Sequence, residues 1–412
     1  MTKVMKSIPL AILWVIIATI HSGHAFRTLS ANFTRTIYIS ALAAAVYFFF
    51  MIFFDKNRKL KFRAEDFVFI VSFYMVASTY YLDDFRAGSF YRITLSVILF
   101  AYFIVKLYSF RQVLTLYMVL MTITSVLALV GYYLANYTTV LDALPLYTNG
   151  NNIEYAVGGL FNFIKAKPER NCGMFWEPGL FATHLIIATV IDLVSRRRGS
   201  FLRILLFSVC LFTTTSSAGY ALWAICVVLF FARNNKKGKK NKYRFLIAFA
   251  FFVLAVTVFL NLDYIIMNTG LKDNEYIQKL TLENILDSSR VKAMIHNFKS
   301  FMSSPYFGVG YVHAMENIRH VADTSTSTYL LSVFGFLGGF YTLFIVFGVF
   351  RLKKVNILSK FLILAIALII VNKEPHLQNV FSWILIFYLV RGVSKEGSER
   401  KVRKERVITG AN

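Results

Sequence analysis

Long apolar runs alternate with short polar segments along nearly the whole chain. An apolar run of about 20 residues with few charges is long enough to cross a bilayer as a helix. The runs predict about twelve membrane-spanning helices, at residues 8–20, 37–54, 67–82, 93–107, 113–134, 178–194, 202–212, 218–231, 245–262, 329–350, 358–371 and 380–390. We therefore expect an all-α polytopic membrane protein that forms one integral domain over residues 1–412.

The first apolar run has two interpretations. Lys3 and Lys6 precede it and Gly23-His24-Ala25 follows it, which imitates a cleavable signal peptide. Because so many spans follow, we interpret the run as the first transmembrane helix and keep cleavage as the alternative.

The basic residues predict the orientation of the chain. Lys and Arg number 45 against 21 Asp and Glu, a formal net charge of +24, which in a soluble protein would suggest nucleic acid. Here the basic residues gather between apolar runs, at 56–63, 196–198 and 233–244, and in the tail 393–412. Cytoplasmic loops are enriched in Lys and Arg. We therefore expect both termini in the cytoplasm and no nucleic acid partner.

Two long loops lie on the opposite, outer side in this topology, at residues 135–177 and 263–328. In the first loop the apolar piece 156–164 is too short to span, so it lies in the interface or re-enters the membrane. In the second loop, residues 288–303 have apolar positions at helical spacing with Lys292, His296 and Lys299 on another side, which predicts a short amphipathic helix.

The end of the first outer loop contains the strongest candidate for chemistry. The segment 170–179 places Arg170, Trp176 and Glu177 immediately before a predicted helix that opens with Pro178 and Gly179. Proline fits the first helical position because its missing amide would be unpaired there. The amides of the first turn and the positive end of the helix dipole favour an anion.

The second outer loop contains further titratable residues. Arg290 falls in the first turn of the amphipathic helix, where the dipole disfavours a cation, so either a role with an anion or a solvated arginine explains it. After Pro305 and a glycine-containing turn come His313, Arg319, His320 and Asp323. The segment 323–328 also suits a simple helix cap.

Neither a metal nor a cofactor is expected. The three cysteines, Cys172, Cys210 and Cys226, have no paired spacing, and two of them fall inside apolar runs. Ionisable residues are almost absent from the middle of the spans, which disfavours transport.

An ordered set of motifs resembles a known family. A Glu-Pro-Gly motif opens a mid-chain helix, and a Thr/Ser-rich turn at 213–220 follows two helices later. The second outer loop has an arginine and a Ser-Pro-x-Phe-Gly-x-Gly turn at 304–310, and a glycine-containing helix follows. Together these resemble the O-antigen and capsular polysaccharide polymerases and their relatives, the O-antigen ligases.

The resemblance implies a glycosyltransferase at the periplasmic face of the bacterial inner membrane. Its donor and acceptor are both glycans on undecaprenyl diphosphate, and a chain-length regulator protein is a possible partner. Ligases of this superfamily usually have a histidine before the helix that follows the large loop, and residues 324–329 contain none. This favours a polymerase. An O-antigen ligase that transfers glycan to lipid A-core is the first alternative, and a lipid-linked oligosaccharide flippase is the second.

The reaction suggests roles for the candidates. Arginine binds phosphate oxygens in pairs, so Arg170 and Arg290, with Arg319 third, are candidates to stabilise the leaving diphosphate. Glu177 is the first candidate for the base that accepts the hydroxyl proton, although the helix dipole alone also explains a carboxylate there.

Other residues are candidates for the base or for sugar binding. His313, His320 and Asp323 follow Glu177 as candidate bases or substrate contacts. Trp176 and Tyr311 can stack on sugars, and an interfacial aromatic belt explains them equally well.

Overall fold

A computed structural model of the chain describes residues 8–25, 31–54, 61–83, 87–139, 143–149, 152–195, 199–232, 289–317, 325–353 and 355–392. The described residues form a mostly helical protein with one small sheet. Its helices are α1 (Ile8–Ile20), α3 (Ala31–Phe54), α4 (Ala64–Leu82), α5 (Gly88–Leu107), α6 (Phe110–Tyr137), α7 (Pro178–Ser195), α8 (Ser200–Thr213), α9 (Ser217–Ala232), α14 (Ser289–Ser303), α15 (Gly310–Asn317), α16 (Thr326–Phe334), α17 (Phe336–Phe350), α18 (Ile357–Lys373) and α19 (Val380–Arg391).

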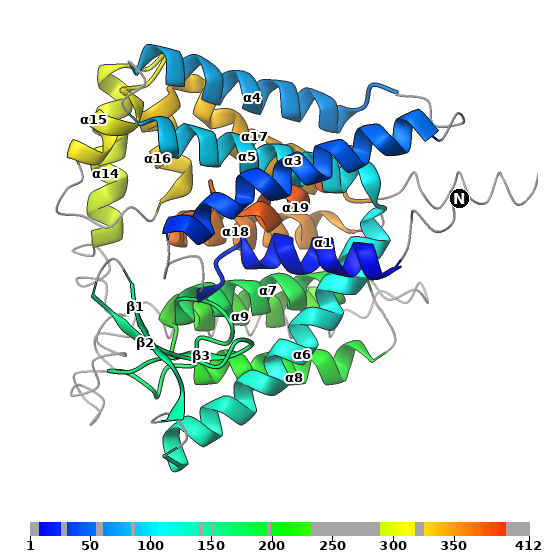
Figure 1. Cartoon of the computed structure of the whole chain (residues 1–412). Helices are drawn as coiled ribbons and strands as arrows, with labels where there is room; N and C mark the ends of the chain where they lie inside the picture. Colours follow the sequence, from blue (N-terminus) through cyan, green and yellow to red (C-terminus); the bar gives the residue numbers. More distant parts are fainter. Residues whose placement is uncertain are drawn as a thin grey trace, which may run out of the picture.

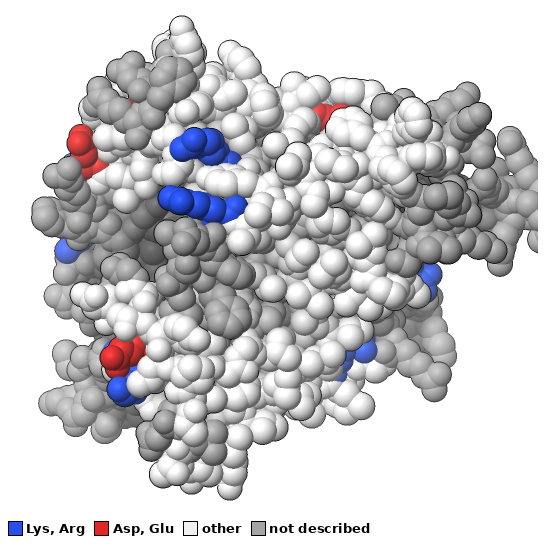
Figure 2. Space-filling view, viewed as in Figure 1, with Lys and Arg blue, Asp and Glu red and all other residues white. Residues whose placement is uncertain are grey.

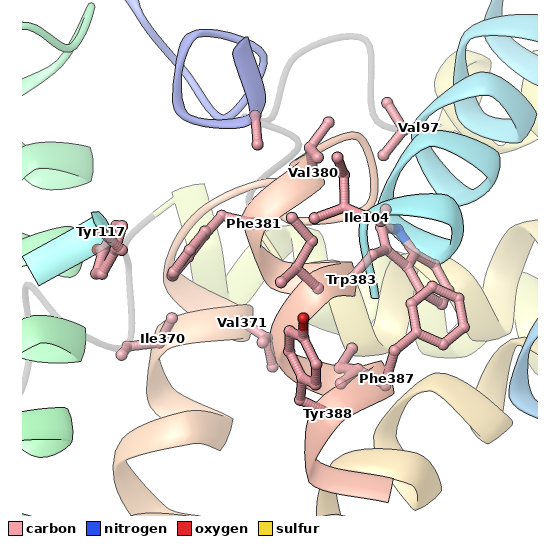
Figure 3. Packing of buried hydrophobic residues seen from close by; sticks show 14 of the residues in the cluster. Val97, Ile104, Tyr117, Ile370, Val371, Val380, Phe381, Trp383, Phe387 and Tyr388 are labelled. Carbon is pink, nitrogen blue, oxygen red and sulfur yellow. The ribbon is translucent and has the colours of Figure 1, made fainter. Parts of the chain in front are cut away.

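The long helices form a bundle with α19 near its middle (Figure 1). The apolar side chains of α19 are buried on several sides, because α1, α4, α5 and α17 all pack against it. Phe381 stacks on Tyr117 of α6 with ring centroids 3.8 Å apart (Figure 3). Trp383 contacts Tyr341 of α17. A helix that is apolar all round suits such a central position.

The outer surface of the bundle is apolar. On α3, Ile39, Leu42, Val46, Phe49 and Phe53 recur every three or four residues and are 60% to 80% exposed. On the face seen in Figure 2 the charged side chains are few, and the broad middle of the bundle is uncharged. An exposed apolar stripe of this kind is what a helix presents to lipid.

Among the described helices, four are long and apolar enough to cross a membrane. They cover residues Arg35–Phe54, Gly88–Leu107, Phe110–Tyr137 and Pro178–Ser195, and α1, α8, α9, α17 and α19 are shorter apolar helices. The span expected at 245–262 lies outside the described residues. The number of about twelve spans and the cytoplasmic position of both termini stay predictions.

The all-α expectation is wrong in the loop 135–177. Strands β1 (Leu146–Thr148), β2 (Glu154–Val157) and β3 (Asn162–Ile164) form an antiparallel sheet in that order. The segment 156–164, expected to lie in the interface or to re-enter, is therefore a hairpin, in which Ala156 pairs with Phe163. A turn at Gly158 and Gly159 reverses the chain, and Gly159 has a φ of +85°. The two glycines permit the turn, and the buried Tyr155 and Phe163 anchor the strands.

The single helix expected at 329–350 is broken into α16 and α17 at Gly335. Gly335 has a φ of 60° and a ψ of −145°, and a Cβ there would meet the carbonyl oxygen of Pro305 at 2.5 Å. The amide of Phe336 donates to that same carbonyl at 2.8 Å. The helix breaks at Gly335 because the turn after α14 packs there, and its Pro305 carbonyl accepts a backbone amide of the next helix.

Candidate active site

The segment 170–179 is fixed against the end of α1. The amide of Trp176 donates to the Gly23 carbonyl at 3.1 Å, and the amide of Ala25 donates to the Met174 carbonyl at 3.2 Å. His24 forms an isolated antiparallel bridge with Phe175 between these bonds. The end of the loop 135–177 is therefore held in place by backbone pairing with residues about 150 positions earlier in the chain.

Two of the motifs noted in the sequence lie side by side. Asn171 is buried, and its amide donates to the Thr213 carbonyl at 2.9 Å while its side-chain nitrogen donates to Thr213 Oγ1 at 3.0 Å. Arg170 Nε donates to Thr215 Oγ1 at 3.1 Å. The Thr/Ser-rich turn between α8 and α9 therefore positions the arginine that precedes the Glu-Pro-Gly motif.

Glu177 starts α7 as the sequence predicts. Its carbonyl accepts the amides of Leu180 at 3.2 Å and Phe181 at 3.1 Å, and Pro178 is the first helical residue. The half-buried carboxylate thus stands at the positive end of a helix dipole, where negative charge is stabilised.

A buried lysine joins this helix start to the connection between α18 and α19. Lys373 Nζ donates to the Gly179 carbonyl at 2.8 Å and to Ser216 Oγ at 3.2 Å. Glu374 Oε1 lies 3.7 Å from the same ammonium, and the two side chains are only 4% and 2% exposed. Buried charges of this kind are stable when they are paired and hydrogen-bonded.

Gly179 makes this approach possible. A Cβ at Gly179 would meet Glu374 Oε1 at 2.6 Å, Lys373 Nζ at 3.2 Å and Glu177 Oε1 at 3.6 Å. Two carboxylates and an ammonium therefore surround the first turn of α7, and only a glycine leaves room for them.

The start of α16 completes the wall beside Glu374. Thr326 Oγ1 donates to the Glu374 carbonyl at 2.9 Å and accepts the His376 amide at 2.8 Å. Asn372 Oδ1 accepts the hydroxyl of Ser325 at 2.9 Å. His376 is fully buried, and burial lowers its pKa to about 3, so its ring is neutral at physiological pH.

Two further candidates lie on α15. His313 is exposed on α15, and its Nδ1 lies 3.3 Å from Glu316 Oε2. The ring of Tyr311 stacks on Phe90 at 4.0 Å, and its amide donates to Tyr91 Oη at 3.0 Å. Helix α15 packs against α4, α14 and α16. The structure thus joins these residues to α4 and α5, whereas it joins Glu177 to α18.

The remaining candidates are placed only in part. Trp176 is half-buried beside Gly23, where it follows the bridge to α1. Arg290 lies in the first turn of α14, and its side chain is outside the described residues. Arg319, His320 and Asp323 lie outside the described residues altogether. Among the residues that the structure does describe, no group of three His, Cys, Asp or Glu is placed to hold a metal.

From the sequence, Lys373 and Glu374 fall in the last outer loop of the predicted topology, where they are candidates to extend the acceptor groove but not for a catalytic role. One signal was present: Glu374-Pro375, in the short polar connection before residues 380–390, repeats the Glu177-Pro178 pair. Asn171 and Ser216, which hold the segment together, lie within the 170–179 segment and the 213–220 turn, but neither residue was itself a candidate.

Apolar helices around a buried polar cluster at one end define the class as a helical membrane protein. A family model described as WcaD colanic acid polymerase matches residues 67–270, about half of the chain, including residues 170–179 and the 213–217 turn. The match confirms the resemblance to the polysaccharide polymerases and indicates a surface polysaccharide polymerase, an enzyme of the glycosyltransferase type. No curated protein and no solved structure matches the chain in the same comparisons.

Proposed function

We propose that this protein polymerises a bacterial surface polysaccharide from lipid-linked repeat units. The donor is a glycan on undecaprenyl diphosphate, and the acceptor is the non-reducing end of another lipid-linked unit. The reaction takes place at the periplasmic face of the inner membrane, without a metal or a nucleotide sugar.

One observation carries the proposal: Glu177 and the Lys373–Glu374 pair surround the start of α7, and Arg170 binds Thr215, the neighbour of the Ser216 that Lys373 contacts. The matched family region contains Arg170 and Glu177. The surrounding loop ends are the ones that the charge pattern predicts to be outer. Polar groups at that membrane surface suit a substrate whose lipid lies in the bilayer and whose glycan lies in water.

The proposed step is a displacement at the anomeric carbon. The acceptor hydroxyl oxygen forms a bond to that carbon, the bond from the carbon to the diphosphate oxygen breaks, and its electron pair stays on the diphosphate. Glu177 accepts the hydroxyl proton, which contributes roughly 10²–10⁴-fold when the base is well placed. Arg170 and Arg290 stabilise the leaving diphosphate, helped by the α7 dipole.

Other residues are assigned to the sugars in this proposal. Trp176 and Tyr311 stack on sugar rings. Arg319, His320 and Asp323 contact the second glycan, and His313 is the alternative base.

The test is a cell-free reaction of the purified protein in nanodiscs with its lipid-linked repeat unit. We expect a ladder of products spaced by one repeat, lost in Glu177→Gln and Arg170→Ala. Glu154→Gln is the matched control, because Glu154 is a half-exposed carboxylate of the same loop, 3.1 Å from Lys165. Transfer onto added lipid A-core instead of a ladder would establish a ligase. Movement of the unit across the bilayer without any transfer would establish a flippase.

A further inference from the structure

Helix α14 presents three different surfaces around its axis. A helix advances about 100° per residue, so residues seven apart lie nearly in line. Ala293, Asn297 and Ser300 are buried and form one side. The apolar residues Met294, Ile295, Phe298 and Met302 form a second side, and the exposed Lys292, His296 and Lys299 form a third.

The buried side seats α14 on the bundle. Asn297 Nδ2 donates to Thr328 Oγ1 of α16 at 3.4 Å, and Phe301 packs against Phe336 of α17 with ring centroids 5.3 Å apart. Figure 1 shows α14 lying across the end of the bundle that bears the sheet, crosswise to α4 and α5. It is therefore a surface helix of that end and does not run along the spans.

The apolar side is largely uncovered by the residues that the structure describes. Its four residues are 37% to 61% exposed, although a single amphipathic helix in a globular protein turns such a side to the core. The apolar surface is also continuous with α17, because Tyr306, just after α14, contacts Phe336 with ring centroids 6.0 Å apart. Phe336, Leu343 and Phe347 form an exposed apolar stripe along α17.

We propose that α14 is an interfacial helix whose apolar side is embedded in the outer leaflet of the membrane. The stripe on α17 contacts acyl chains, and α14 extends that contact to the headgroup boundary. Lys292 and Lys299 point away from the acyl chains, toward the phosphate groups of the lipid headgroups. An apolar face bounded by lysines is the pattern of helices that lie in the membrane plane. This inference does not depend on glycosyl transfer.

The test compares adjacent positions on the apolar and cationic sides. Phe298→Cys with Lys299→Cys, and Ile295→Cys with His296→Cys, each receive a fluorescent maleimide in nanodiscs. The native Cys172, Cys210 and Cys226 are at most 2% exposed, so the unaltered chain serves as the labelling blank. Quenching is measured with lipids spin-labelled near the headgroup and, separately, with a water-soluble quencher.

We expect lipid quenching to be several-fold greater at positions 298 and 295 than at 299 and 296, and aqueous quenching to show the opposite order. Equal aqueous quenching at the two positions of each pair would overturn the proposal. Shielding of positions 298 and 295 from both quenchers would also overturn it, because that result is expected if a second copy or another protein covers α14. The two pairs are independent, so one pair suffices where a variant of the other does not fold.

Discussion

The Lys373 ammonium donates a hydrogen bond to the Gly179 carbonyl at 2.8 Å, across 194 residues of sequence. A cation near the start of a helix is opposed by the helix dipole. Glu374, at 3.7 Å, and the hydroxyl of Ser216 offset this cost. The contact thereby fixes the first turn of α7, and with it Glu177, to the far end of the chain.

Gly179→Ala should abolish polymerisation without a matching loss of stability. The new Cβ would meet Glu374 Oε1 at 2.6 Å and Lys373 Nζ at 3.2 Å, so the ion pair must move away from α7. Helix propensity alone would favour alanine by up to about 1 kcal/mol. The measurements are the product ladder and the apparent melting temperature in detergent.

The control for this variant is Gly339→Ala in α17. Its Cβ would meet the end of the Leu331 side chain at 3.4 Å, an ordinary contact. Full activity in Gly179→Ala would show that the ion pair can leave the first turn of α7 without consequence for the reaction.

Lys373→Met should destabilise the protein by about 3–5 kcal/mol, because it leaves the buried Glu374 carboxylate without its cation. Adding Glu374→Gln should recover part of the lost stability, since the double variant no longer buries an unpaired carboxylate. The four melting temperatures of this double-mutant cycle give the coupling directly. If the losses of stability in the two single variants simply add in the double variant, Lys373 and Glu374 do not stabilise each other.

Local signals predicted the helix start but not this contact. The start of α7 at Pro178 follows from proline chemistry, and the amphipathic pattern located α14 to within one residue of its start. The approach of Lys373 to Gly179 depends on how α7 and α18 pack, which no neighbouring residue in the sequence encodes.

The same reason explains the two errors in the fold. Gly335, Gly338 and Gly339 look alike in sequence, and only the entry of the Pro305 carbonyl makes Gly335 the point where the helix breaks. The apolar segment 156–164 is equally suited to lipid and to a sheet until β1 supplies a pairing strand. Arg170 and Glu177 could be named as candidates because charge and the start of a helix are local properties, and their catalytic roles stay predictions.

Acidification from pH 7 to pH 5 should lower stability through His376. Its folded pKa is about 3, below the usual value of 6.5, because of burial, with His184 and Lys373 adding to the effect. Between these values the unfolded chain binds more protons, so the stability is fully present above about pH 6.5 and is lost as pH falls. The loss at pH 5 is about 2 kcal/mol.

The measurement is the melting temperature between pH 5 and 7.5 for the parent, His376→Gln and His313→Gln. His376→Gln should flatten the dependence, since glutamine can still hydrogen-bond Ser382, which lies 2.8 Å from His376 Nδ1. His313 is exposed, so its variant should follow the parent. An unchanged slope in His376→Gln would assign the dependence to other groups.

Lys106→Met should weaken the opposite end of the bundle and leave the chemistry intact. Lys106 Nζ lies 2.6 Å from Asp66 Oδ1 and 3.3 Å from Glu65 Oε1, and all three side chains are largely buried. Its loss leaves two carboxylates close together, with Arg391 Nε 3.7 Å from Glu65. The expected destabilisation is about 3–5 kcal/mol. This cluster joins α4, α5 and α19 and makes no contact with Glu177 among the contacts described above. The protein molecules that remain folded should therefore make the same product ladder at the same rate per molecule.

Loss of the product ladder in protein that is demonstrably folded would mean that the two ends of the bundle are coupled through α19.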